Sequence, residues 1–200
     1  MVTLITPNIP AIEGSDFPSQ GQWTYEDYLR LPDDDNRYEI IEGVLYMANA
    51  PAYDHQYTVS KILQKLANHV EDKKSGVVLT APFEIHLSEK TRPVQPDVLF
   101  IANDRKPDVS AQVFKGSPDI VVEVISPSSL RLDQHIKFGA YEQAKVREYW
   151  LVDPKTRSVE VYSLPKDGPE YVLLGQFSNN EKMKSAVLDG LEIDVSSLFA

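Results

Sequence analysis

Two carboxylates stand where the sequence otherwise predicts buried strands. Glu123 lies inside the apolar run 120–125, on one of the two faces that alternate along a strand. Asp97 follows Pro96 and opens the run 97–101, so we expect it at the entrance of a second strand. A carboxylate among apolar neighbours is costly unless it is paired, hydrogen-bonded or bound to a metal ion. The pattern therefore indicates a site that uses these acids.

The helix expected after Glu123 carries a second set of polar side chains. Asp133, Lys137 and Tyr141 are spaced by four residues, so they form one row along an α-helix, next to its apolar stripe. Two strand carboxylates that face a helix-borne ammonium suit Mg²⁺ or Mn²⁺, because hard cations prefer oxygen ligands and keep several waters. The lysine would then orient or activate water, or stabilise charge that develops at phosphorus. Glu39, in an earlier predicted strand, is a third carboxylate that would complete the shell.

Each of these residues also has an ordinary structural interpretation. Glu123 would sit on an exposed strand face and pair with a lysine, and Asp97 would hydrogen-bond a turn at the strand entrance. Asp133 and Lys137 would form a surface helix pair that contributes only ~0.3–0.5 kcal/mol. Tyr141 would belong to the core or its rim.

Composition restricts the function further. The chain has 200 residues, no cysteine, and 30 acidic against 20 basic residues, for a net charge of −10. Disulfides, cysteine-ligated zinc, iron–sulfur clusters and a thiol nucleophile are excluded, and a cytoplasmic location is compatible with this composition. No apolar run approaches the ~20 residues that span a bilayer, and the start of the chain does not resemble a signal peptide. A strongly acidic protein is a poor indiscriminate binder of nucleic acid.

These residues must be positioned by helices and strands. The order of the helices and strands that the sequence predicts indicates one α/β (α+β mixed sheet) domain at 23–200, preceded by an irregular arm at 1–22. A capping box at Thr24 begins a short helix, and the pair Glu42-Gly43 turns an N-terminal hairpin at 37–47. In chain order the remaining predicted elements are a helix at 54–73 closed by Ser75-Gly76, strands at 83–87, 97–101 and 119–125, a helix from the cap at 126–129 to 145, strands at 149–152, 159–162 and 171–177, and a short terminal helix at 195–199.

Several ordered pieces resemble the Uma-two family of restriction-endonuclease-like proteins, which are abundant in cyanobacteria. The pieces are RYEIIEG at 37–43, Pro96-Asp97, VVEVISPSS at 121–129, Asp133 with Lys137 and Tyr141, and EYWLVDP at 148–154. The resemblance runs from about residue 24 to residue 199. It implies membership of the PD-(D/E)xK nuclease superfamily, with a central four-stranded mixed sheet flanked by helices and metal-dependent phosphodiester cleavage.

The resemblance also implies roles for individual residues. Asp97 matches the motif aspartate and Glu123 its acidic partner, while Glu39 matches an acid contributed earlier in the chain. The superfamily's usual lysine lies two residues after the acidic partner, where this chain has Ile125, which cannot serve. Lys137 matches the lysine that this family carries on the following helix, so it must reach the site from there.

His55, near the start of the long helix, matches a further family feature and would line the site, although a helix-start or surface histidine is the more ordinary interpretation. The resemblance implies a restriction-endonuclease-like core. It also implies a Mg²⁺- or Mn²⁺-dependent endonuclease that acts on nucleic acid, with DNA a better candidate than RNA. By analogy with enzymes that cut two strands, we expect a homodimer. Because the sequence lacks a long apolar run, we expect no membrane partner. The alternative is an inactive nuclease fold that serves as an interaction or assembly module, which the charge of −10 favours.

Overall fold

The computed structural model describes residues 17–34, 36–48, 50–127 and 129–200. Its elements are, in chain order, α1 (Tyr25–Tyr28), β1 (Arg37–Ile41), β2 (Val44–Ala48), α2 (Tyr53–Lys73), β3 (Gly76–Thr80), β4 (Glu84–His86), β5 (Val98–Ala102), η1 (Asn103–Arg105), β6 (Val113–Lys115), β7 (Ile120–Val124), η2 (Leu132–Lys137), α3 (Phe138–Gln143), β8 (Glu148–Asp153), β9 (Ser158–Ser163), β10 (Val172–Ser178), β11 (Lys182–Lys184), β12 (Glu192–Asp194) and η3 (Val195–Leu198). No helix in these residues is both long enough and apolar enough to cross a membrane.

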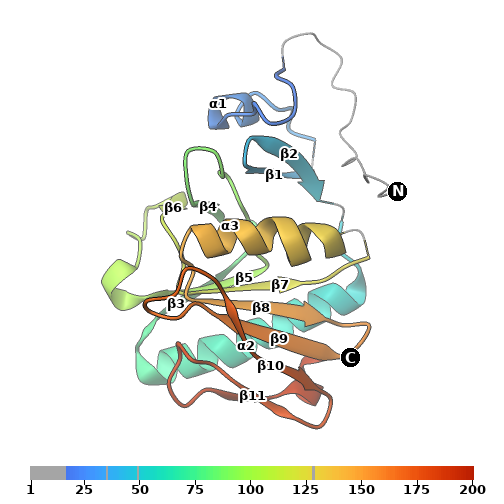
Figure 1. The fold of residues 1–200 in the computed structure, drawn as a ribbon, viewed down its shortest axis with the longest axis vertical. Helices are drawn as coiled ribbons and strands as arrows, with labels where there is room; N and C mark the ends of the chain where they lie inside the picture. Colours follow the sequence, from blue (N-terminus) through green and yellow to red (C-terminus); the bar gives the residue numbers. More distant parts are fainter. Residues whose placement is uncertain (1–16, 35, 49, 128) are drawn as a thin grey trace.

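A six-stranded mixed sheet forms the centre of the structure (Figure 1), where the resemblance implied four strands. Its strand order is β10-β9-β8-β7-β5-β3. β7 and β8 run parallel, and the other neighbours are antiparallel. The α/β class with a mixed sheet is therefore confirmed, with two more strands than expected.

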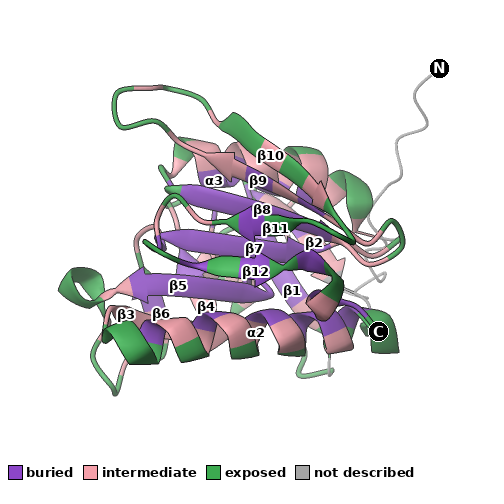
Figure 2. Ribbon diagram, turned by 90° about the horizontal axis from the view of Figure 1, so that it is seen from below, coloured by how far each residue is buried: buried purple, intermediate pink, exposed green. Residues whose placement is uncertain are grey.

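Helices cover both faces of this sheet. On one face, the apolar stripe of α2 that includes Ile62 and Leu66 packs against the sheet, as its spacing predicts. β11 and β12 lie over the same face (Figure 2), and buried residues of β11, β12 and η3 belong to the same hydrophobic cluster. η2 and α3 lie on the opposite face, where the ring of Tyr141 is 5.4 Å from that of Tyr149. The cavity described below opens on the face covered by η2 and α3.

The N-terminal hairpin is attached to the segment that leads into β5. Its turn residues Glu42 and Gly43 have φ angles of 51° and 72°, which is the left-handed backbone that a two-residue hairpin turn with the correct twist requires. The backbone N–H of Ile40 donates to the carbonyl of Pro93 over 2.9 Å. β1 therefore lies beside the residues that precede Asp97, on the α3 side of the sheet (Figure 1).

Three local predictions need correction. The helix after β7 contains a π-helical segment, η2, where the sequence predicted a regular α-helix, and α3 continues it with α-helical hydrogen bonding. α2 ends at Lys73, and the left-handed residue that closes it is Lys74, not the pair Ser75-Gly76. Gly76 instead begins β3, which the sequence did not predict. A Cβ at Gly76 would lie 2.1 Å from the Ile101 carbonyl oxygen, so only glycine fits this strand pair.

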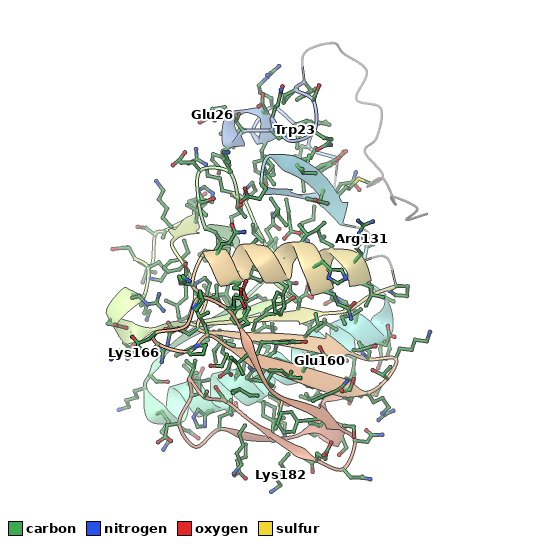
Figure 3. The ribbon with its side chains drawn as sticks, in the orientation of Figure 1. Trp23, Glu26, Arg131, Glu160, Lys166 and Lys182 are labelled. Carbon is green, nitrogen blue, oxygen red and sulfur yellow. The ribbon has the colours of Figure 1, made fainter. Side chains whose placement is uncertain are left out.

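The predicted arm is described only in part, because residues 1–16 lie outside the described residues. Residues 17–22 contain no helix or strand. Phe17 stacks on Trp23 at 5.4 Å between ring centroids, and the Gly21 N–H donates to the Gly43 carbonyl over 2.8 Å. Trp23 lies next to the hairpin (Figure 3). The division into an arm at 1–22 and a domain at 23–200 stays a prediction.

Candidate active site

Six of the seven predicted site residues line one cavity of about 210 Å³. They are Glu39, His55, Asp97, Glu123, Asp133 and Lys137. The seventh, Tyr141, lies beside Glu123 and donates its hydroxyl hydrogen bond to Glu123 Oε1 over 2.6 Å. The structure thus brings together side chains that are up to about a hundred residues apart in the sequence, and their roles in catalysis stay predictions.

Sheet register explains why Asp97 and Glu123 meet. β5 and β7 are antiparallel with Val98 opposite Val122, so one further step along the pair brings Asp97 level with Glu123 on the other face of the sheet. The Val124 N–H donates to Asp97 Oδ2 over 2.9 Å, which fixes the carboxylate at the end of β7. The two acids therefore share the face covered by η2 and α3.

Lys137 reaches the acids from the last turn of the π-helix η2. Its ammonium donates to Glu123 Oε1 over 3.0 Å and lies 3.1 and 2.9 Å from the two carboxylate oxygens of Glu39. Only 2% of Lys137 is exposed. The wider turn of a π-helix is a recurrent feature of functional sites. The helix-borne lysine predicted from the sequence therefore enters the site, although the helix that carries it is not the regular α-helix expected. Arg131, labelled in Figure 3, immediately precedes this π-helix.

Glu39 is positioned by the docking of the hairpin. The backbone N–H of Gln95 donates to Glu39 Oε1 over 2.6 Å, two residues before Asp97. Glu39 is 2% exposed, and its carboxylate contacts the ammonium of Lys137 and the backbone N–H of Gln95. Glu42, the competing carboxylate, instead accepts a hydrogen bond from the Thr91 hydroxyl over 2.9 Å and belongs to the turn.

His55 joins the site from the first turn of α2. Its Nε2 lies 3.2 Å from Asp97 Oδ2, and its Nδ1 is buried without a hydrogen-bond partner among the residues that the structure describes. His55 therefore lies in the wall of the cavity, and its role there stays a prediction. Asp97 Oδ2 contacts both His55 Nε2 and the backbone N–H of Val124, and these two contacts orient the carboxylate.

Each of the two central carboxylates keeps one oxygen without a hydrogen bond to the described residues. Both hydrogen bonds to Glu123 end on Oε1, which leaves Oε2 free. Asp97 Oδ1 has only the guanidinium of Arg37, at the long distance of 3.9 Å. These two oxygens would be available to a cation in the cavity.

Burial and charge shift the pKa values of the site in opposite directions. Burial raises the pKa of Glu123 to about 8, and Lys137 only partly offsets this effect. Burial also raises the pKa of Asp133 to about 6. For Lys137, burial acts to lower the pKa, but the surrounding carboxylates, Glu123 first, outweigh it and hold the pKa above its usual range. The ammonium therefore stays charged among carboxylates that differ in their readiness to ionise.

The pKa of Asp97 moves the other way. Burial would raise it, but the hydrogen bond and charge of His55 and the charge of Lys137 outweigh burial and hold the pKa of Asp97 below its usual value. Asp97 is thus the acid of this pair that is ionised most readily. Asp133 is 3% exposed and contributes charge to the cavity, which corrects its interpretation as part of a surface helix pair.

Arg37 and Gln95 belong to the site but were not assigned a role from the sequence. Arg37 lines the cavity, two residues before Glu39 on the same face of β1. That spacing was a signal for Arg37. Nothing in the sequence indicated Gln95, because its contact with Glu39 exists only through the docking of the hairpin.

The carboxylate oxygens of the cavity are the type of ligand that suits Mg²⁺ or Mn²⁺, but their number is smaller than in a complete protein-built metal site. Asp97 and Glu123 present the carboxylate oxygens that hard cations prefer. Among the described residues, no group of three or more His, Asp and Glu side chains is arranged to hold a metal ion. Mg²⁺ commonly binds through one or two carboxylates and fills its remaining positions with water and substrate phosphate. Two carboxylates beside a water-accessible cavity are sufficient for that mode.

A solved structure has the same fold as this chain. Over 88% of this chain and 97% of the other, the fold matches a crystal structure from Anabaena variabilis, described as "a putative nuclease belonging to DUF820". The TM-score is 0.73 at 19% sequence identity, so the two proteins share a fold.

The particular family follows from the sequence. The model of the Uma2 family, described as "Putative restriction endonuclease", matches residues 25–196, and the chain belongs to this family. Two similar relatives come from Synechocystis sp. The uncharacterized protein sll1609 is 26% identical over 125 residues, which cover 62% of this chain and 70% of the relative. The uncharacterized protein slr1290 is 25% identical over 162 residues, which cover 80% of this chain and 84% of the relative. The family resemblance is therefore confirmed.

Proposed function

We propose that this protein is a divalent-metal-dependent nuclease that hydrolyses phosphodiester bonds, with Asp97 and Glu123 as the cation ligands. The observation that carries the proposal is the pair of unbonded carboxylate oxygens in one cavity, next to the buried ammonium of Lys137. A cation bound there would supply a Lewis acid that polarises the phosphoryl group and makes water a better nucleophile.

The protein's own residues account for positioning and charge. Lys137, whose ammonium donates to Glu39 and Glu123 in the wall of the cavity, stabilises negative charge on the phosphate or orients the attacking water. Glu39 holds Lys137 in place, and Tyr141 holds Glu123 by its hydroxyl hydrogen bond. Arg37 faces Asp97 across 3.9 Å and is one-third exposed, so it is available to a substrate phosphate.

The charge balance of the cavity supports a cation. Among the described residues, its lining contains four carboxylates, Glu39, Asp97, Glu123 and Asp133, and two permanent cations, Lys137 and Arg37. With all of these ionised, two negative charges remain uncompensated, which a divalent ion would neutralise. Such an ion would also offset, at the site of reaction, the repulsion between a protein of net charge −10 and a polyanionic substrate.

A specific observation also supports the second candidate, an inactive nuclease fold that acts as an interaction module. Lys137 already pairs with Glu39 and Glu123, so the cluster is compensated in part without a metal ion. This interpretation predicts a folded protein that binds no divalent cation in the cavity. The two candidates therefore differ in cation binding as well as in activity.

A nuclease assay on labelled single- and double-stranded DNA and RNA, with Mg²⁺, Mn²⁺ or EDTA, tests the first proposal. We expect cleavage that requires the cation, with DNA cut in preference to RNA. The variants Asp97→Asn, Glu123→Gln and Lys137→Met should each lower the rate by at least about a hundredfold, the range typical of removing one group that stabilises transition-state charge. Glu192→Gln is the matched control, because Glu192 pairs with Lys184 at the exposed surface. Cleavage that survives all three site changes would assign the activity to another site or a contaminant.

Analytical ultracentrifugation of the same protein samples tests the predicted homodimer. Two copies are required if one active site cuts each strand of a duplex. A monomeric protein that nicks only one strand would refute the dimer without refuting the cation site.

A further inference from the structure

A shallow groove of about 490 Å³ lies on the outer face of α2, away from the central sheet. We call it the α2 groove. Successive residues of its lining are spaced by three, four or one positions, so they share one side of the helix. Figure 2 shows that this outward side of α2 is not covered by another element. The lining residues are Tyr53, Gln56, Tyr57, Ser60, Lys61 and Gln64.

The first turn of α2 separates this groove from the catalytic cavity. Ala52 and His55 line the catalytic cavity, whereas Tyr53 and Gln56 line the α2 groove. Neighbouring residues of one turn thus face the two hollows. A polymer that leaves the catalytic cavity past Ala52 would therefore meet Tyr53 next.

The tyrosine ring at this end of the groove is both exposed and supported. Tyr53 is 76% exposed. Its ring centroid lies 6.0 Å from that of Tyr57, with 34° between the ring planes. A single exposed aromatic side chain is ordinary on a protein surface, but a second ring stands beside this one. A fixed, solvent-exposed aromatic ring is the kind of surface on which nucleobases stack.

The charge of the helix suits a phosphate chain better than the rest of this acidic protein does. Residues 55–70 contain no aspartate or glutamate but two lysines, Lys61 and Lys65. The ammonium of Lys61 lies 5.3 Å from the ring centroid of Tyr57 and has no carboxylate partner among the described residues. The nearest acid along the helix, Asp54, accepts a hydrogen bond from the backbone N–H of His55. The charge of Lys61 is therefore available to a phosphate.

We propose that the α2 groove binds a single strand of nucleic acid that continues from the catalytic cavity, with one base stacked on Tyr53 and one phosphate paired with Lys61. The inference rests on the proposed nuclease function and deepens it by naming the form of the substrate. From Tyr53 to Lys61 the helix rises by about 12 Å, the length of roughly three nucleotides in a stacked strand. Because every base has a face that can stack, this contact selects unpaired strands without selecting a sequence.

A protein partner suits this groove less well. The fully buried centre of a protein interface is mostly apolar. Around the two tyrosines the α2 groove instead presents the polar side chains of Gln56, Ser60 and Gln64. These side chains suit a hydrated polyanion, and a second copy of the chain is the alternative occupant that the experiment must distinguish.

Fluorescence anisotropy in the presence of Ca²⁺ tests the stacking contact. The probes are a labelled twelve-nucleotide thymine strand, an abasic strand of the same length and charge, and a blunt duplex. The thymine strand should bind more tightly than the abasic strand, and Tyr53→Ala should weaken its binding by about tenfold, within the range for one stacked base. Tyr53→Phe should retain the affinity, because the ring remains. Leu29→Ala is the matched control, since it shortens another exposed apolar side chain, outside both the groove and the cavity.

The duplex and the salt dependence sharpen this test. Tyr53→Ala should leave the affinity for the duplex unchanged, because paired bases are not free to stack on the ring. Lys61→Met should lower the slope of log affinity against log salt concentration by about 0.7, the value for one phosphate contact of a single strand. Lys166→Met, at an exposed position between β9 and β10, should leave the slope unchanged.

Three results would overturn the proposal. Equal affinity for the thymine and abasic strands would exclude a stacked base. Unchanged binding of the thymine strand by Tyr53→Ala, or an equal loss for the duplex, would remove Tyr53 from the contact. If Tyr53→Ala converts a dimer to a monomer in analytical ultracentrifugation but leaves strand affinity unchanged, the groove is an interface between two copies of the chain.

The outcome is also separable from that of the nuclease assay. Strand binding that depends on Tyr53 and Lys61, without metal-dependent cleavage, would support the α2 groove and refute the nuclease. Metal-dependent cleavage whose KM for the thymine strand is unchanged by Tyr53→Ala and Lys61→Met would support the nuclease and refute the role of the groove.

Discussion

The substitution Lys137→Met tests the charge balance of the site in a single measurement. Methionine keeps most of the volume of lysine but removes the ammonium that lies within 3.1 Å of both Glu39 and Glu123. Removing one partner of a buried ion pair costs about 3–5 kcal/mol, because the remaining charge is uncompensated. Two carboxylates lose the same partner here, so we expect the free energy of unfolding to fall by at least about 3 kcal/mol at pH 8.

The loss should depend on pH in a defined direction. Without the ammonium, the folded-state pKa values of Glu123 and Asp133 lie further above their unfolded values, so the folded state of the variant takes up protons more readily. Stability from such groups is present at low pH and is lost as the pH rises through the folded-state pKa. The difference between wild type and Lys137→Met should therefore be small near pH 4 and largest near pH 8.

Urea unfolding followed by tryptophan fluorescence measures this difference, because Trp150 is fully buried in the central sheet. Lys184→Met is the matched control, since its pair with Glu192 is exposed, and we expect it to change the midpoint little. Mn²⁺ should restore part of the stability of Lys137→Met by replacing the lost positive charge. Equal stability of Lys137→Met and wild type from pH 4 to pH 8 would refute the reasoning.

Three further changes test separate parts of the structure. Burial raises the pKa of Asp133 to about 6. The stability that Asp133 contributes is therefore present at a pH below its ordinary pKa and is lost as the pH rises through about 6. Asp133→Asn should stabilise the protein at pH 8 by on the order of 2–3 kcal/mol and leave it unchanged near pH 3.5, which thermal unfolding at both pH values measures. Tyr141→Phe removes the 2.6 Å hydrogen bond to Glu123 and should cost about 1.5–3 kcal/mol in urea unfolding; an unchanged midpoint would contradict this role. Gly76→Ala would place a Cβ 2.1 Å from the Ile101 carbonyl oxygen and should cost about 3 kcal/mol or more, so a variant with the thermal midpoint of wild type would show that this contact is wrong.

The parts of the site that the sequence predicted have local signals. Glu123 and Asp97 were found because a charge inside or beside an apolar strand is unexpected, and strand alternation places such a residue on a definite face. The hairpin was found from its turn pair, Glu42-Gly43, and α2 from its apolar spacing. These patterns depend only on residues a few positions apart, so they can be seen in a single sequence.

The features that were missed depend on packing between distant segments. β3 begins at Gly76, which is needed there because the backbone of β5 lies too close for a side chain. The residues of β3 themselves do not indicate this close approach. The apolar positions of η2 and α3 fit an ordinary helix, so the π-helix hydrogen bonding could not be distinguished by spacing. Gln95 acquires its role when the hairpin docks beside it, and two extra strands extend the expected four-stranded sheet to six.

The most direct test of the account is a crystal structure of the wild-type protein grown with Mn²⁺ and measured at a wavelength where manganese scatters anomalously. The account predicts an anomalous peak in the cavity about 2.1–2.2 Å from one oxygen of Asp97 and one of Glu123, within the range for a hard cation. Crystals of Glu123→Gln should show no peak or a much weaker one. An empty cavity in the wild-type crystal, with Lys137 still bound between Glu39 and Glu123, would contradict the cation site and favour the interaction module.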